Sequence, residues 1–234
     1  MNSVTTLIQS PLVARVAPFV VFLLLTFFQG YLGEPGRFWI YLAKTLVGAW
    51  LLRLVWNVVS EMRWRISWEA VVVGVAVFSV WVGLDGIIPD QKQMWIKLGL
   101  SKAPATPEPA WNPFLQFDGG APLAWLFVAV RIAGSSLVVP PLEEVFYRSF
   151  LYRWVAKPDF ESVPLGQFSM KPFVITALIF GLAHNEWLAG ILCAAAYQGL
   201  VCRKKRLGDA MTAHAITNFL LGVWVVWKGA WHFW

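Results

Sequence analysis

Charged residues are scarce in this 234-residue chain, and their scarcity excludes an ordinary soluble domain. Asp, Glu, Lys and Arg make up 14% of the sequence and hydrophobic residues 58%, whereas a soluble domain averages about 25% charged residues. The 15 Trp and 17 Phe agree with this, because Trp in particular collects at the membrane interface. The composition therefore predicts an integral protein of the cell membrane that crosses the bilayer several times and contacts its lipid.

Cysteines and long basic runs are also scarce. Cys193 and Cys202 both lie in or at the end of an apolar segment, which is typical of small buried side chains rather than of a disulfide framework or a thiolate metal site. The formal net charge is +6, but no basic run is long or interleaved with stacking aromatics, so we expect no nucleic-acid partner. An excess of positive charge in a membrane protein reflects basic loops and anionic headgroups.

Internal repeats, low-complexity tracts and a second domain are not visible either, so we expect one integral membrane domain over residues 1–234. A helix needs about 20 mostly apolar residues to cross the hydrocarbon core. The candidate stretches are residues 13–32, 38–59, 68–88, 122–139, 140–156, 172–187, 188–201 and 209–227. They predict an all-α fold, a polytopic bundle of about eight transmembrane helices.

Positive charges in and between these stretches leave the orientation open. We expect the long stems of Lys44 and Arg53 to carry their charges towards the two interfaces. With eight spans, Arg63 and Arg65 fall on the opposite side from the basic residues 203–206, and the positive-inside rule cannot satisfy both. If residues 122–155 formed one broken element, this count would change.

Residues 140–148, PPLEEVFYR, place two adjacent carboxylates and an arginine inside an apolar stretch. A charge at the bilayer centre costs about 2.5 to 3.5 kcal/mol, so such residues usually have a function. We expect the diproline to end one helix and begin the next, because proline suits a first turn. On that new helix Glu144 and Arg148 lie four residues apart and share a face. Glu143 points about 100° away and is therefore left free for chemistry.

Two further polar sets have helical spacing. Phe180 and His184 lie four residues apart, as do His214 and Asn218, so each pair shares a helix face. If the bundle brings these sets to Glu143, a carboxylate or imidazole could take a proton from water, and an imidazole could protonate a leaving amine. The second imidazole and the amide could stabilise an oxyanion, which is worth about 2.7 to 4 kcal/mol per donor. This combination indicates amide hydrolysis.

Other interpretations remain open for the same residues. A lone histidine is usually a core residue, and Glu144 with Arg148 could simply fix helix packing. Intramembrane Glu, His and Arg are also typical of a transporter or proton-linked carrier, although we see no inverted repeats. A non-catalytic membrane binding or immunity protein would be a third class. A serine nucleophile is not favoured, because no Gly-x-Ser-x-Gly turn surrounds Ser135 or Ser136.

The ordered set Glu-Glu-x-x-x-Arg, Phe-x-x-x-His and His-x-x-x-Asn resembles the motifs of the CAAX prenyl protease and bacteriocin-processing family of intramembrane peptidases, the type II CAAX endopeptidase-like group. The resemblance covers about residues 122–222, which we expect to be the catalytic core. The stretch WVGLDG at residues 81–86 is similar to the bacterial branch found alongside exosortase systems.

The resemblance implies an endopeptidase whose site lies inside the membrane. It implies that Glu143 and His184 activate the attacking water, that His214 and Asn218 stabilise the oxyanion, and that Glu144 and Arg148 support them. The substrate would be a membrane-associated peptide or protein: a prenylated C-terminus, a leader peptide or a sorting-signal protein.

The family is also described as metal-dependent, which would make Glu143, His184 and His214 the ligands of a Zn²⁺ ion. The sequence lacks the usual zinc-protease signature, because Asn185 and Leu188 follow His184 where Glu and His would be needed. We therefore favour a metal-free glutamate mechanism with no cofactor. The oligomeric state is left open.

Overall fold

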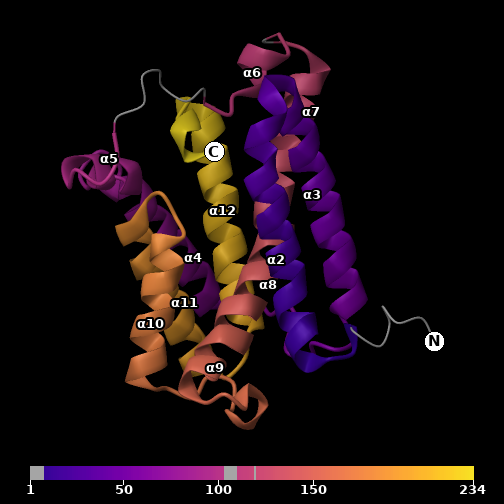
Figure 1. Ribbon diagram of the computed structural model, residues 1–234, viewed down its shortest axis with the longest axis vertical. Helices are drawn as coiled ribbons and strands as arrows, with labels where there is room; N and C mark the ends of the chain where they lie inside the picture. Colours follow the sequence, from indigo (N-terminus) through magenta and orange to yellow (C-terminus); the bar gives the residue numbers. More distant parts are fainter. Residues whose placement is uncertain (1–7, 103–109, 119) are drawn as a thin grey trace.

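The computed structural model describes residues 8–102, 110–118 and 120–234, and these residues form helices and turns but no strand. The elements are α2 (Pro11–Gln29), α3 (Gly33–Val55), α4 (Trp68–Leu84), α5 (Gln91–Lys97), α6 (Pro113–Gln116), α7 (Pro122–Ala133), α8 (Val139–Glu144), α9 (Tyr152–Ala156), α10 (Met170–Leu182), α11 (Trp187–Lys204) and α12 (Gly208–Lys228) (Figure 1). The short 3-10 turns are η1 (Gly30–Leu32), η4 (Phe160–Ser162) and η5 (Trp231–Phe233). The predicted all-α class is confirmed.

Among the residues that the structure describes, four helical runs are long and apolar enough to cross a membrane: Pro11–Leu32, Pro35–Val55, Pro122–Ala156 and Gly208–Lys228. Two shorter helices, Trp68–Gly83 and Met170–Leu182, are also apolar. The long helices stand side by side, and the short α5 lies apart from them at one end (Figure 1). The chain is therefore an integral membrane helix bundle, as its composition predicts.

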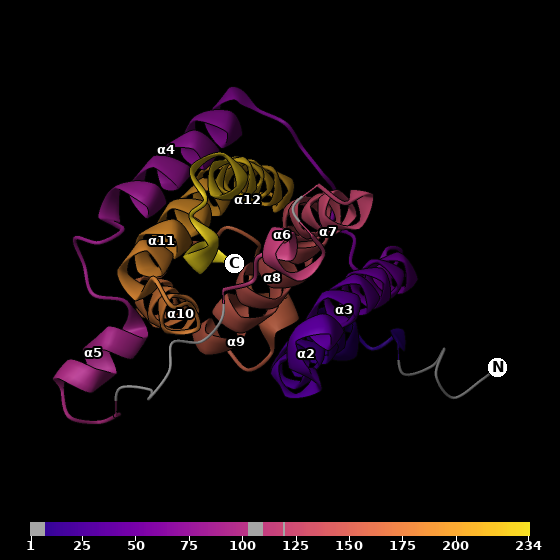
Figure 2. The same cartoon turned by 90° about the horizontal axis from the view of Figure 1, so that it is seen from above.

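The helices form two groups joined by the run from α7 to α9. Seen from above, α2 and α3 form a pair on one side, whereas α4, α10, α11 and α12 gather on the other (Figure 2). α8 passes between the two groups and contacts α2, α3 and α12. Residues on α8 can therefore reach both groups at once.

The predicted helix boundary at the diproline is wrong. Pro122–Ala156 is a single run of 35 residues, in which the π-helical turns η2 (Gly134–Val138) and η3 (Val145–Leu151) flank α8. The N–H of Val139 bonds to the carbonyl of Gly134, five residues back. In this wider register the next residue, Pro140, has no N–H to give to Ser135. The carbonyl of Ser135 instead accepts a hydrogen bond from the side chain of Asn218, and π turns are frequent at functional sites.

Joining these two stretches also removes the conflict over positive charge. Gly208 packs so closely on the carbonyl of Arg63 that any Cβ at this position would overlap it. The hydroxyl of Thr212 donates to the carbonyl of Arg65 at 2.9 Å, and the Lys205 ammonium donates to the carbonyl of Gly166 at 2.6 Å. The loops of residues 56–67, 157–169 and 205–207 therefore lie at one end of the bundle, which we call the basic end.

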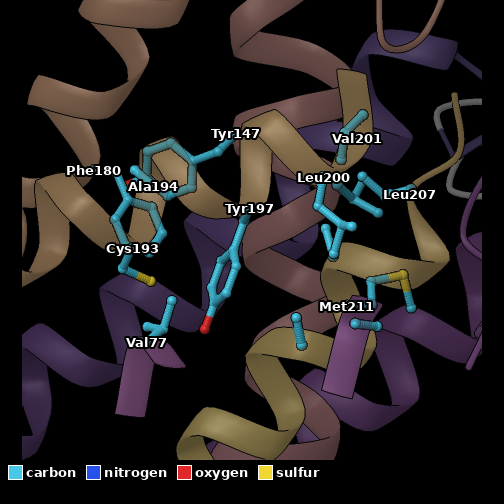
Figure 3. Packing of buried hydrophobic residues seen from close by; sticks show 14 of the residues in the cluster. Val77, Tyr147, Phe180, Cys193, Ala194, Tyr197, Leu200, Val201, Leu207 and Met211 are labelled. Atoms are coloured by element: carbon cyan, nitrogen blue, oxygen red, sulfur yellow. The ribbon is translucent and has the colours of Figure 1, made fainter. Parts of the chain in front are cut away.

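Small residues bring α10 and α11 into close contact. A Cβ on Gly190 would lie 2.9 Å from the Cα of Gly181, and one on Gly181 would lie 2.7 Å from the carbonyl of Trp187. Small residues thus let the backbones of the two helices approach closely. The hairpin is part of the largest core cluster, in which Tyr147 and Phe180 lie beside Cys193 and Tyr197 (Figure 3).

A buried polar cluster ties α2 to the Pro122–Ala156 run near the basic end. Arg15 donates from Nε to Oε1 of Glu61 at 2.8 Å and from Nη2 to Oε2 at 3.0 Å. The hydroxyl of Ser149 donates to the same carboxylate, and Nη1 of Arg153 lies 3.9 Å from it. We call Arg15, Glu61, Ser149 and Arg153 the Glu61 cluster.

Candidate active site

A cavity of about 340 Å³ lies between the two helix groups. Its walls come from α2, α3, α4, the Pro122–Ala156 run, the α10–α11 turn, α11, α12 and the C-terminal residues. Glu143, His184, His214 and Asn218 all line this cavity. The structure thus brings together, around one space, four side chains that come from three distant parts of the chain.

Glu144 is completely buried and holds two partners. Its Oε1 lies 3.0 Å from Nδ1 of His214, and its Oε2 lies 3.1 Å from Nε of Arg148, although the second contact is not aligned as a hydrogen bond. An ionised carboxylate can only accept, so Nδ1 of His214 carries a proton and the imidazole is fixed in orientation. Glu144 and Arg148 form the expected pair.

His214 contacts Glu144, whereas the sequence led us to expect the two histidines to meet at Glu143. Adjacent residues on a helix point about 100° apart, so only one of two neighbouring acids can face α12. In the Pro122–Ala156 run, Glu144 is the acid that faces α12 and contacts His214. The sequence spacing identified the two acids but not which of them faces the histidine.

Glu143 lines the cavity and has one carboxylate oxygen without a partner among the described residues. Its Oε2 is buried and accepts no hydrogen bond from the described residues. Within that part of the chain, Glu143 has no hydrogen bond or ion pair with His184 or His214. A buried polar atom without a partner is costly, and the residue that carries it lines a space large enough for water or substrate. Of the two acids, Glu143 is the one available for chemistry.

His184 lies in the turn between α10 and α11, just beyond Leu182. Its Nδ1 is 2.7 Å from the carbonyl oxygen of Phe180. A carbonyl can only accept, so Nδ1 carries the proton in the neutral ring and Nε2 is the basic nitrogen. The ring stacks on Phe180 with centroids 4.5 Å apart, and the edge contact with Trp81 is 5.7 Å. The shared face predicted for Phe180 and His184 is confirmed.

His214 and Asn218 lie one turn apart on α12. The buried ring of His214 stacks on Tyr197 at 5.2 Å. The side-chain nitrogen of Asn218 donates to the carbonyl of Ser135 at 2.8 Å. This is the carbonyl that loses its helical donor because residue 140 is proline. The diproline thus helps to anchor the asparagine, whose second N–H remains available.

Two cations that line the cavity, Lys44 and Arg131, were not predicted from the sequence as site residues. The exposed fraction of Lys44 is only 4%. The expectation that Lys44 reaches an interface is therefore wrong, whereas Arg53 on the same helix is exposed. The contact of Lys44 with the Tyr41 ring explains its inward position. The contact between α3 and α7 depends on tertiary packing, and no residue spacing in the sequence predicts it.

The residues that could bind zinc do not form a preassembled site. Within the described parts of the chain, no group of three or more His, Cys, Asp or Glu side chains is arranged to hold a metal ion. Glu143, His184 and His214 nevertheless share a cavity. Nδ1 of His214 is held by Glu144 and Nδ1 of His184 by the carbonyl of Phe180, which leaves Nε2 of each ring free.

Residues 123–220 match the family model described as Type II CAAX prenyl endopeptidase Rce1-like. No curated protein and no solved structure matches the chain. The matched segment runs from α7 to α12 and contains the six residues that the sequence singled out: Glu143, Glu144, Arg148, His184, His214 and Asn218.

Proposed function

From the premise that residues 123–220 are an Rce1-like domain of the CAAX prenyl protease and bacteriocin-processing family, a CAAX-type intramembrane protease, we propose that Glu143 and His184 activate the water that cleaves the peptide bond. One observation carries this proposal. Glu143, His184, His214 and Asn218 line one cavity, and one oxygen of the Glu143 carboxylate is buried without a partner among the described residues.

The first step is the attack of water. A water molecule in the cavity donates one hydrogen bond to the carboxylate of Glu143 and the other to Nε2 of His184. Glu143 takes one proton while the water oxygen bonds to the peptide carbonyl carbon, so that a tetrahedral oxyanion forms. A positioned general base typically contributes a factor of about 10² to 10⁴.

The second step is the stabilisation and collapse of this oxyanion. The second N–H of Asn218 can donate to it, and so can Nε2–H of a protonated His214 whose Nδ1–H is held by Glu144. Such donors act strongly in a site without bulk water. The C–N bond then breaks, and the proton held by Glu143 passes to the leaving amine. Glu144 and Arg148 position His214 and do not touch the substrate.

The test is cleavage by the purified protein in detergent. A panel of internally quenched peptides, with and without a prenylated CAAX-type end, is incubated with wild type and with Glu143→Gln, and products are identified by mass spectrometry. We expect wild type to cleave members of the panel and Glu143→Gln to be slower by about 10²-fold or more. Cleavage by the variant at the wild-type rate would overturn the role of Glu143.

The metal-free mechanism has a separate test. Treatment with 1,10-phenanthroline should leave the cleavage rate unchanged. If the chelator abolished cleavage and Zn²⁺ restored it, the carboxylate-base mechanism would be wrong even though the protein is a protease.

We also propose that the protein crosses the cell membrane several times with its basic end in the cytoplasm. The short loops at this end and the adjoining end of α11 carry seven of the 19 Lys and Arg residues, namely Arg63, Arg65, Lys157, Arg203, Lys204, Lys205 and Arg206, and such basic loops are retained inside. The α10–α11 turn and the C-terminus lie toward the other end of the bundle (Figure 1), and His184, Phe233 and Trp234 from these segments line the cavity. The cavity then opens outward, which favours a leader peptide or sorting-signal protein over a cytoplasmic prenylated C-terminus.

Cysteine accessibility tests this orientation. In a Cys202→Ser background, Asn185→Cys should react with a membrane-impermeant maleimide in intact cells, whereas Arg206→Cys should react only after permeabilisation. The opposite pattern would reverse the orientation without affecting the proposed chemistry.

A further inference from the structure

Two cations, Lys44 on α3 and Arg131 on α7, face the same cavity as Glu143. Both lie against the ring of Tyr41. The Nζ of Lys44 is 4.7 Å from the ring centroid, and the Cζ of Arg131 is 4.4 Å from it. The two positive charges thus form one patch on the cavity wall built by the N-terminal half of the chain and α7.

No carboxylate balances this patch within the described side chains. The charged group that acts on Lys44 is Arg131, a second cation. The charged or ionisable groups that act on Arg131 are Tyr41 and Arg37, neither of which is an acid that could pair with it at neutral pH. Acidic residues do occur elsewhere around the cavity, but none of them forms an ion pair with Lys44 or Arg131.

Neutral contacts stabilise the patch only in part. Lys44 donates to the hydroxyl of Thr26 at 3.0 Å, which leaves two of its three N–H groups. The rings of Phe22, Tyr41 and Trp111 lie within cation–π distance of one or other charge, and such contacts offset some of the desolvation. Two like charges at a buried wall remain costly without an anion.

We propose that Lys44 and Arg131 form a carboxylate subsite that holds an anionic group of the substrate peptide while Glu143 and His184 act on the peptide bond. This inference rests on the proposed function. A peptide that occupies the cavity has carboxylates as its anionic groups, either at its C-terminus or on Asp and Glu side chains. Lysine supplies a point charge and arginine a planar fork of donors, and both suit a carboxylate.

Through this subsite, the N-terminal helices α2 and α3 would take part in substrate recognition. Lys44 and Thr26 lie on α3 and α2, outside the segment that matches the protease family. A carboxylate fixed against this wall sets how far the peptide extends toward Glu143. The subsite would therefore select both the peptide and the bond that is cleaved.

Binding to the inactive Glu143→Gln protein tests the subsite without any cleavage. The probes are a dansyl-labelled Val-Ile-Ala tripeptide with a free C-terminus, its C-terminal amide, and two amides that carry an internal Asp or Asn. We expect at least one carboxylate probe to bind about tenfold or more tightly than its uncharged partner. The C-terminal pair and the Asp/Asn pair show which carboxylate is recognised.

The variants Lys44→Met and Arg131→Met should each remove most of this preference, and Lys44→Arg should keep it. Arg53→Met is the matched control, because Arg53 lies on the same helix but is exposed, and it should change nothing. A preference that survives in folded Lys44→Met and Arg131→Met, or the absence of a preference in every pair, would overturn the subsite. The subsite would also be wrong if Lys44 and Arg131 proved necessary only for binding to phosphatidylglycerol vesicles.

The outcomes separate this inference from the proposed function. If Glu143→Gln abolishes cleavage but no probe shows a carboxylate preference, the protease proposal stands and the subsite is wrong. If the preference depends on Lys44 but wild type cleaves no peptide, the subsite is right and the cavity binds peptides without cleaving them.

Discussion

The Glu61 cluster and the cavity around Glu143 both bury carboxylates beside arginines, and both draw on the same helical run. In the Glu61 cluster each carboxylate oxygen accepts a hydrogen bond from Arg15, and Ser149 adds another. In the cavity, Glu143 has a buried oxygen with no described partner. The difference teaches that a buried charge is not by itself a sign of function. The informative feature is an unpaired group that faces an open space.

Glu144 stands between these two extremes. It borders the catalytic candidates, yet its two oxygens are directed to His214 and Arg148, as those of Glu61 are directed to their partners. We therefore group Glu144 with the structural acids, and we expect its loss to affect folding and the orientation of His214 together.

The largest expected effect on stability is that of Arg148→Met. Arg148 is buried, its exposed fraction being 2%, and its removal leaves the fully buried Glu144 without its cation. Breaking a buried pair in this way typically costs about 3 to 5 kcal/mol. The free energy of unfolding in detergent measures it, and Glu144→Gln combined with Arg148→Met should recover part of the loss. Arg53→Met should change stability by less than about 0.5 kcal/mol. If Arg53→Met and Arg148→Met destabilised the protein equally, the pairing of Arg148 with Glu144 would be refuted.

Glu61→Gln should have the next largest effect. The substitution weakens the charge-assisted bonds from Arg15, each of which typically contributes about 1.5 to 3 kcal/mol. Because the Glu61 cluster lies away from the cavity, the cleavage rate per folded molecule should stay near that of wild type. If Glu61→Gln kept the stability of wild type but lost cleavage, Glu61 and Glu143 would not differ in the way we propose.

The environment of Glu61 also predicts how stability depends on pH. Burial alone would raise the pKa of Glu61, but the hydrogen bond from Ser149 and the charge of Arg15 outweigh it and lower the pKa. A lowered pKa in the folded state adds stability above the ordinary glutamate value of about 4.3, and this is lost as the pH falls through the folded pKa. Wild type should thus lose more stability below about pH 4 than Glu61→Gln. Parallel curves for the two proteins would contradict the assignment.

The smallest expected loss of stability is that of Gly181→Ala, about 1 to 3 kcal/mol from overpacking. The new Cβ would lie 2.7 Å from the carbonyl of Trp187, so the α10–α11 turn that carries His184 must shift. Because small displacements of a catalytic group are costly, cleavage should fall by about tenfold or more. The matched control is Gly199→Ala on α11, where a Cβ meets nothing within 4 Å. If both variants behaved alike, close packing would not position His184.

The sequence predicted those features that depend on neighbouring turns of one helix. The spacing of Phe180 and His184 and that of Glu144 and Arg148 predicted contacts that the structure contains. Composition also predicted the helical membrane bundle. These inferences succeeded because helical geometry fixes which side chains four residues apart can meet.

The features that the sequence did not predict depend on packing between helices. Proline rules indicated a helix boundary at Pro140, but a π-helical register and Asn218 accommodate the missing donor. The choice of Glu144 over Glu143 as partner of His214 depends on the rotation of one helix against another. The inward turn of Lys44 requires Tyr41 and α7 to meet. None of these contacts leaves a periodic signal in the sequence.

One experiment tests the contrast between the two acids most directly. Glu143→Gln and Glu61→Gln are purified in the same detergent, and the unfolding temperature and the rate of peptide cleavage are measured for each. We expect Glu143→Gln to keep its unfolding temperature and lose cleavage, and Glu61→Gln to lose unfolding temperature and keep its rate per folded molecule. Cleavage by folded Glu143→Gln at the wild-type rate would contradict the account.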